Sequence, residues 1–280
     1  MLIPTYEPGP EVRAAVASVL SQRDVAVDVQ ILDDGSRIGP ERHLREVLDD
    51  PRVVVRHSSV NRGAAATWND LFASATAPYV KLLPQDDLLA PGCLRAQLDA
   101  LRGSDAVVAA GRRRLLTRKG RRFGPAFGLA GLEGLRTRQE VIDATARSGG
   151  NPVGEPGSWL IYREAATPVR FRREAGYAVD LAYLFDLLAR GPLIGIPSVH
   201  TYFRVSNTAW TSRLAREQVN DVVRLLDEVG HSDTDGASAH RIGRTIRRRS
   251  LVRRAIYLAL GGSRPEGSRP AQGLRRGSTR

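Results

Sequence analysis

The chain has 280 residues, 42% of them hydrophobic and 26% charged, which is ordinary for a globular protein. No run of about 18 apolar residues is present, so no membrane-spanning helix is expected, and the single cysteine, Cys93, excludes an intramolecular disulfide. The net charge of +12 is concentrated in residues 240–280, which hold twelve arginines and one glutamate, so the rest of the chain is almost neutral.

The first hundred residues alternate between short apolar segments and helical patterns. Val- and Ile-rich strands and amphipathic helices are predicted in the order 11–22 (helix), 25–32 (strand), 52–57 (strand), 64–75 (helix) and 91–102 (helix). Such alternation is typical of a parallel sheet with helices on both faces, whose ligands bind beyond the carboxyl ends of the strands. Only residues 1–3 precede the first turn, so we expect the natural start of the first strand to lie upstream.

The second half of the chain is less regular. A glycine-rich stretch over 120–134 is predicted to be irregular. Beyond it the pattern predicts a helix over 137–147, a strand over 158–162, a helix over 180–189, strands over 193–196 and 199–205, and a helix over 214–229. Residues 231–239 are typical of a linker, and the segment from 261 onward is too poor in apolar residues to fold.

Three polar loops carry two pairs of carboxylates at the ends of predicted strands. These loops are Asp33-Asp34-Gly35-Ser36, Ser59-Val60-Asn61-Arg62-Gly63 and Gln85-Asp86-Asp87. Because parallel strands end at one edge of a sheet, the loops should converge there. Two separate pairs of carboxylates suit a nucleoside diphosphate held through a divalent cation, with one pair at the base or ribose and the other at the metal.

The same loops belong to a wider set of motifs that resembles the family 2 glycosyltransferases. In chain order the motifs are Ile3-Pro4-Thr5-Tyr6, Ser18-Val19-Leu20-Ser21-Gln22, Asp33-Asp34-Gly35-Ser36, Asn61-Arg62-Gly63 with Asn69, and Gln85-Asp86-Asp87. The resemblance is specific over residues 1–95 and looser to residue 212. It implies an α/β fold of the GT-A type, with a doubly wound, mostly parallel sheet, a nucleoside-diphosphate sugar donor, Mg²⁺ or Mn²⁺, and inversion at the anomeric carbon.

The resemblance also implies roles for individual residues on the donor side. Thr5 and the pair Asp33-Asp34 would hold the base and ribose, and Arg62 would approach the ribose or phosphates. Asp87 would be the direct metal ligand, with Asp86 nearer the ribose or a metal-bound water. The residues expected to bind the nucleotide sugar are therefore Thr5, Asp33, Asp34, Arg62, Asn69 and Asp86, and those expected at the metal are Asp87 and Asp86.

Asp180 is the candidate catalytic base. The segments 154–159 and 177–180 resemble the acceptor side of the family, where a carboxylate at the start of a helix takes a proton from the acceptor hydroxyl. Asp186 lies six residues on, roughly 240° around a helix, so it cannot face the same site. A plain helix-capping role for Asp180 is the alternative, and the two roles are compatible.

Two positions depart from the family pattern. Pro84 stands where many members have an aspartate, and Ser206 stands where many have a histidine that approaches the diphosphate. His200 lies six residues before that position, too early to replace the histidine, so a structural role is expected for it. These departures favour one alternative to an active enzyme, a degenerate glycosyltransferase fold that acts as a binding or scaffold protein.

The basic tail admits more than one interpretation. Apolar residues between its arginines can form an amphipathic helix on an anionic membrane surface, beside lipid-linked acceptors, and a solvated, partly disordered tail is the alternative. Aromatic residues are scarce there, so no nucleic-acid partner is expected. With no secretory signal visible, we expect a cytoplasmic or inner-membrane peripheral enzyme that builds cell-surface glycans or glycolipids. The expected organisation is a GT-A domain over 1–230, divided into a nucleotide-sugar half (1–110) and an acceptor half (111–230), followed by a linker and tail over 231–280.

Overall fold

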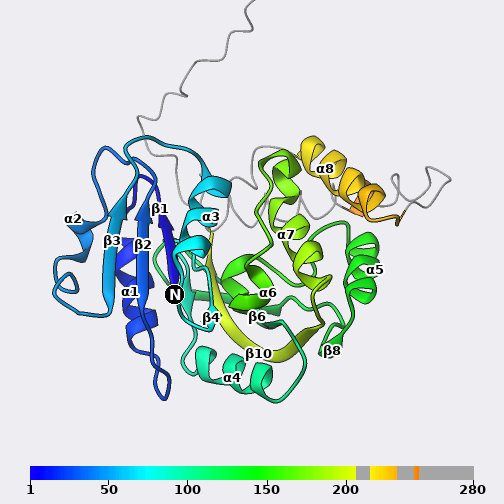
Figure 1. Ribbon diagram of the computed structural model, residues 1–280, viewed down its shortest axis with the longest axis horizontal. Coiled ribbons are helices and arrows are strands. Elements are labelled where there is room, and N and C mark those ends of the chain that lie inside the picture. Colours follow the sequence, from blue (N-terminus) through cyan, green and yellow to red (C-terminus); the bar gives the residue numbers. More distant parts are fainter. Residues whose placement is uncertain (206–214, 232–242, 246–280) are drawn as a thin grey trace, which may run out of the picture.

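The computed structural model describes residues 1–205, 215–231 and 243–245. Its first three strands form a parallel sheet in the order β1-β2-β3 (Figure 1). They are β1 (Leu2–Thr5), β2 (Val29–Asp33) and β3 (Val53–His57). Leu2 extends the sheet through a parallel bridge to Leu82. Its N–H donates to the Lys81 carbonyl and its carbonyl accepts from the Leu83 N–H, at 2.8 Å each. The loops after these strands therefore leave one common edge.

The remaining strands continue from that junction in the order β4-β9-β6-β10-β5, with β7 paired to β6 and β8 to β10. The pair β6 and β10 is parallel, and β9 is antiparallel to both of its neighbours. The strands are β4 (Tyr79–Val80), β5 (Leu88–Leu89), β6 (Val108–Leu116), β7 (Arg122–Phe127), β8 (Gly134–Arg136), β9 (Trp159–Tyr162) and β10 (Leu193–Arg204).

Helices cover both faces of the sheet because successive strand residues point to opposite faces. Leu2 and Leu32 pack against one core, and their chain neighbours Ile3 and Ile31 pack against the other. The first core includes α3, α5, α6, α7 and α8, and the second includes α1, α2 and α4. The helices are α1 (Glu11–Leu20), α2 (Glu41–Leu44), α3 (Ala64–Ser74), α4 (Cys93–Arg102), α5 (Arg138–Ser148), α6 (Arg163–Ala166), α7 (Val179–Leu188) and α8 (Ala215–Glu228), with 3₁₀ helices η1 (Pro156–Ser158) and η2 (Arg173–Ala178).

The stretch predicted to be irregular over 120–134 is not wholly so. Strand β7 lies within it and pairs with β6, and β8 begins at its last residue. Most of β7 is exposed, so it lacks the alternation of buried and polar residues that reveals a strand in a sequence. The two strands predicted over 193–205 are one strand, β10, with register irregularities between Ile196 and Thr201. An irregularity of this kind allows one strand to continue past Pro197, which cannot donate to the ladder.

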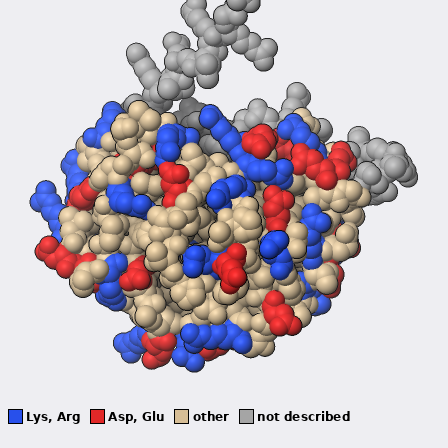
Figure 2. Space-filling model, in the orientation of Figure 1, with Lys and Arg blue, Asp and Glu red and all other residues tan. Residues whose placement is uncertain are grey.

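The surface of the described part carries interspersed charges. Figure 2 shows Lys and Arg mixed with Asp and Glu over the visible face, in agreement with the nearly neutral composition of residues 1–239. Among the described residues, no helix is both long and apolar enough to cross a membrane. The linker and tail predicted over 231–280 lie, apart from residues 231 and 243–245, outside the described residues.

Candidate active site

Asp33, at the end of β2, is buried and joins three loop groups. Its Oδ1 accepts hydrogen bonds from the hydroxyls of Thr5 (3.0 Å) and Ser36 (2.6 Å), and its Oδ2 accepts one from the backbone N–H of Ser36 (2.9 Å). These contacts fix the loop after β2 against the end of β1. The structure thus brings Thr5 and Asp33 together at the expected edge of the sheet.

Asp34 holds the next loop. Its two carboxylate oxygens accept from the backbone N–H groups of Arg62 (2.9 Å) and Gly63 (2.8 Å), directly before helix α3. Gly35 allows this contact, because it has a φ of 73° and a β-carbon there would lie 2.7 Å from the carbonyl carbon of Val60. Asp34 therefore fixes the backbone at the end of the polar loop over 59–63.

Arg62 and Asn69 have partners within the protein. The Arg62 guanidinium is ion-paired with Asp70 on α3. The Asn69 amide makes two bonds to the backbone of one residue: its Nδ2 donates to the Phe171 carbonyl (3.0 Å), and its Oδ1 accepts from the Phe171 N–H (2.8 Å). Phe171 is itself stacked on Tyr183, 3.8 Å between ring centroids. This arrangement gives Asn69 a structural task that uses both ends of its amide, and the nucleotide-binding role stays a prediction.

Asn69→Ala is expected to destabilise the fold by about 1–3 kcal/mol, because it leaves two backbone groups of Phe171 without partners. Urea denaturation of the variant and wild type measures this loss. Nucleotide affinity, measured in parallel at a temperature where both are folded, should stay unchanged. A variant of wild-type stability with weakened nucleotide binding would instead support the role predicted from the sequence.

Asp86 and Asp87 lie on the turn that begins at Pro84. Asp87 is 2% exposed, and its Oδ1 accepts from the backbone N–H of Arg204 (2.9 Å). The Arg204 guanidinium donates instead to the backbone carbonyls of Asp86, Thr117 and Arg118. Burial, reinforced by the neighbouring Asp86 charge, raises the pKa of Asp87 well above its usual value.

These carboxylates fit a divalent cation. No three His, Cys, Asp or Glu side chains gather into a metal site within the described part of the chain, but Mg²⁺ usually binds one or two carboxylates together with substrate phosphates. Asp87 is a buried carboxylate without an ion-pair partner among the described residues, and a cation would offset the cost of its charge. Asp87 Oδ2 lies near Gly157, since a β-carbon added to that glycine would be 3.8 Å from this oxygen.

Asp180 is the second residue of α7, as expected for a carboxylate at the start of a helix. Its Oδ2 accepts from Asn151 Nδ2 (2.8 Å) and its Oδ1 from the backbone N–H of Leu181 (2.9 Å). The N-cap position belongs to Ala178, so Asp180 is not the capping residue. Burial raises the pKa of Asp180 to about 6, although the Asn151 hydrogen bond favours the ionised form.

The loop before η1 supplies Asn151 and Glu155, for which no role was predicted, although Glu155 lies in the segment 154–159 that resembles the acceptor side of the family. Asn151 ties the loop together: its side chain accepts from the N–H groups of Val153 and Gly154 and donates to the Gly154 carbonyl. Glu155 follows, and its carboxylate is ion-paired with Arg113 of β6 (2.8 Å). Its place in the segment 154–159 was the signal for Glu155 in the sequence, but nothing there indicated its distant partner.

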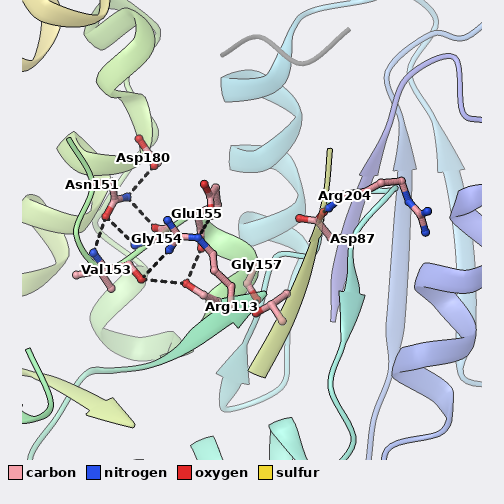
Figure 3. Close-up of polar contacts among 11 residues, drawn as sticks. Asp87, Arg113, Asn151, Val153, Gly154, Glu155, Gly157, Asp180 and Arg204 are labelled. Atoms are coloured by element: carbon pink, nitrogen blue, oxygen red, sulfur yellow. Dashed lines mark hydrogen bonds and ion pairs between the residues drawn. The ribbon is translucent and has the colours of Figure 1, made fainter. Parts of the chain in front are cut away.

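The two carboxylates predicted for catalysis and metal binding lie on opposite sides of this loop. In Figure 3, Asp180 and Asn151 lie on one side of Glu155, and Asp87 lies on the other, beyond Gly157. The nearby Glu155 charge also raises the pKa of both aspartates, after the larger effect of burial. The structure therefore arranges Asp180, Glu155 and Asp87 around one site.

Other predicted positions have different outcomes. His200 is buried, its Nε2 is 2.9 Å from the Ser198 hydroxyl, and burial lowers its pKa to about 4, in agreement with a structural role. Ser206, at the position where many family members have a histidine, lies outside the described residues. Asp186 is ion-paired with Arg172 (3.4 Å), whereas Asp180 is held by Asn151, in agreement with the different directions that their spacing predicted.

The fold defines a glycosyltransferase domain of the GT-A type. The chain belongs to glycosyl transferase family 2, whose family model matches residues 1–166. No curated protein matches the sequence.

Solved structures resemble the fold at low sequence identity. S. aureus TarS 1–349 in complex with UDP-GlcNAc is 14% identical, with a TM-score of 0.65, over 90% of this chain and 72% of that one. The mannosyltransferase PcManGT from Pyrobaculum calidifontis, in complex with GDP-Man and Mn²⁺, is 14% identical, with a TM-score of 0.60, over 94% of this chain and 75% of that one. At such identities the likeness concerns the fold.

Proposed function

We propose that this protein transfers a sugar from a nucleoside-diphosphate sugar to a hydroxyl of a cell-surface glycan or glycolipid, in one metal-dependent displacement that inverts the anomeric carbon. The observation that supports this best is the placement of a partly buried Asp180 and a buried Asp87 on opposite sides of one loop (Figure 3). An in-line displacement needs a base at the attacking oxygen and charge stabilisation at the leaving diphosphate.

On the donor side, Asp87 with Asp86 would hold Mg²⁺ or Mn²⁺, which when bound neutralises charge on the departing diphosphate. Thr5, Asp33 and Asp34 line the loops beside which the base and ribose would bind, and carboxylate oxygens that already accept one hydrogen bond can accept another. That PcManGT is described with GDP-Man and Mn²⁺, and TarS with UDP-GlcNAc, supports a nucleotide-sugar donor here.

On the acceptor side, Asp180 would take the proton from the attacking hydroxyl. Asn151 and the Leu181 N–H each hold one of its oxygens, so the carboxylate has a fixed orientation. Attack from the side of Asp180, opposite the diphosphate, inverts the anomeric carbon. We further propose that the basic residues over 231–280 keep the enzyme on the inner face of the membrane, near lipid-linked acceptors.

A thermal-shift panel tests the donor site. UDP, GDP, dTDP and CMP are each added with and without Mn²⁺, at concentrations up to about a hundred times the dissociation constant of the best ligand. Binding of that strength stabilises a protein by about 2.7 kcal/mol, or roughly 5–10 °C for a domain of this size. We expect one nucleotide to do so only with Mn²⁺. Stabilisation by none of them would favour a degenerate, non-catalytic scaffold.

The pH dependence of transfer tests the base. Burial favours the protonated form of Asp180, and a protonated carboxyl cannot accept the proton of the acceptor, so activity should be lost as pH falls through its pKa of about 6. The rate at pH 5 should be about a tenth of that at pH 8. Asn151→Ala removes a hydrogen bond that favours the ionised form, so the acid limb of its profile should move to higher pH. A limb near pH 4 in the wild type would argue against Asp180.

A further inference from the structure

Glu155 is an acidic residue at the centre of the site to which neither the proposed base nor the metal chemistry gives a task. Its side chain is 38% exposed, and one carboxylate oxygen, Oε2, pairs with Arg113 Nε at 2.8 Å. The other oxygen has no hydrogen-bond partner among the described residues. Figure 3 places the side chain between Asp180 and Asp87. One acceptor group of high charge density is therefore presented to the space between them.

The neighbouring structure is built to hold this carboxylate in place. The Arg113 side chain is only 10% exposed, its guanidinium lies 4.6 Å from the Phe127 ring centroid, and its Nη1 donates to the Val153 carbonyl. Gly154 makes room for it, since a β-carbon at Gly154 would lie 1.7 Å from Nη1. The Glu155 backbone is also fixed, because its carbonyl accepts from the N–H and hydroxyl of Ser158 at 2.8 Å each. Such preorganisation is typical of a group that contacts a ligand.

The position of Glu155 identifies the part of the substrate that it faces. In the proposed reaction the diphosphate lies at Asp87 and the attacking hydroxyl at Asp180, so the group between them is the sugar ring that is transferred. A carboxylate accepts hydrogen bonds only, and a sugar presents hydroxyl donors. An acidic group facing the anionic diphosphate itself would instead be repelled by it.

We propose that Glu155 binds the transferred sugar of the donor by accepting hydrogen bonds from its ring hydroxyls, and that Arg113 is a positioning residue that holds Glu155 in this orientation. This inference rests on the proposed function. It makes Glu155 a determinant of donor-sugar specificity, because a site that supplies a charged acceptor selects against a sugar that lacks the matching hydroxyl.

The test compares the affinity of a nucleoside diphosphate with that of its sugar conjugate. Calorimetric titrations with Mn²⁺ use UDP against UDP-GlcNAc, GDP against GDP-mannose and dTDP against dTDP-glucose, and the pair that binds wild type is used for the variants. In Glu155→Gln, the ratio of nucleotide-sugar affinity to nucleotide affinity should fall about tenfold to a hundredfold, the effect of losing hydrogen bonds to a charged group. The affinity for the nucleoside diphosphate alone should not change.

Matched variants separate binding from folding. Glu133→Gln breaks a similar ion pair with Arg112, the residue before Arg113, and should leave the ratio unchanged. Arg113→Met should lower the ratio as Glu155→Gln does, while Arg113→Lys, which keeps a positive charge beside Glu155, should retain most of the ratio. If Arg113 served folding alone, neither variant would change the ratio. If Glu155→Gln binds no nucleotide, Glu155→Asp takes its place. Aspartate keeps a negative charge beside Arg113, but its shorter side chain cannot extend as far toward the sugar.

The outcomes distinguish this inference from the function on which it rests. A wild type that binds no nucleotide overturns the proposed function, and the inference with it. Normal nucleotide binding with an unchanged ratio in Glu155→Gln, or in Glu155→Asp where that variant is needed, overturns the role of Glu155 alone. An unchanged ratio in Arg113→Met, beside a lowered one in Glu155→Gln, overturns only the positioning role of Arg113.

Discussion

Asp180→Asn should lower sugar transfer at least about a hundredfold while nucleotide binding stays within about twofold of wild type. General-base catalysis by a positioned side chain contributes about 10²–10⁴-fold, and an amide cannot take the proton of the attacking hydroxyl. The amide oxygen can still accept the hydrogen bond from Asn151, so the loop that it anchors should persist. The measurement is the initial rate of sugar release from the donor at pH 8, with acceptor present.

Asp186→Asn is the matched control, because it makes the same change on the same helix. Asp186 is ion-paired with Arg172, and its side chain is 41% exposed. Exposed pairs of this kind contribute about 0–1 kcal/mol, so the control should keep both its stability and its rate. A large loss of rate in both variants would indicate damage to α7 and not the removal of a base. A rate within threefold of wild type in Asp180→Asn would exclude Asp180 as the base.

The fold could be predicted from the sequence where burial leaves a periodic signal. Strands β2 and β3 and helices α1, α3 and α4 all lie within or close to their predicted ranges, since each buries a face against one of the two cores. Strand β7 could not be predicted in this way, because it is held by backbone pairing with β6 and most of its side chains are exposed.

Site residues at the carboxyl ends of strands could be predicted from the sequence, and those whose position depends on a distant partner could not. Asp33 ends β2, Asp34 comes directly after it, and Asp87 follows the parallel bridge at Leu82, so their convergence at one edge could be expected. Glu155 gains its position from Arg113, 42 residues earlier in the chain, and Asn69 binds a backbone 102 residues later. Contacts of that separation leave no local pattern in the sequence.

The last expected result concerns the metal: Asp87→Asn should lose the Mn²⁺-dependent part of nucleotide stabilisation. The wild-type shift of roughly 5–10 °C with nucleotide and Mn²⁺ should fall to the shift that the nucleotide produces alone. The physical reason is that Asp87 Oδ2 loses its charge, while the amide oxygen can still accept from the Arg204 N–H. The variant without ligand should be at least as stable as wild type, because it removes a buried carboxylate whose ionisation is disfavoured.

The control for Asp87→Asn is Asp99→Asn, which breaks a half-exposed pair with Arg95 on α4 and should keep the full Mn²⁺-dependent shift. Asp86→Asn then separates the two neighbouring acids. If Asp87 is the direct ligand, Asp86→Asn retains part of the shift and Asp87→Asn retains none. A full shift in Asp87→Asn would mean that other groups stabilise the diphosphate. The buried Asp87 carboxyl would then destabilise the fold without contributing to metal binding.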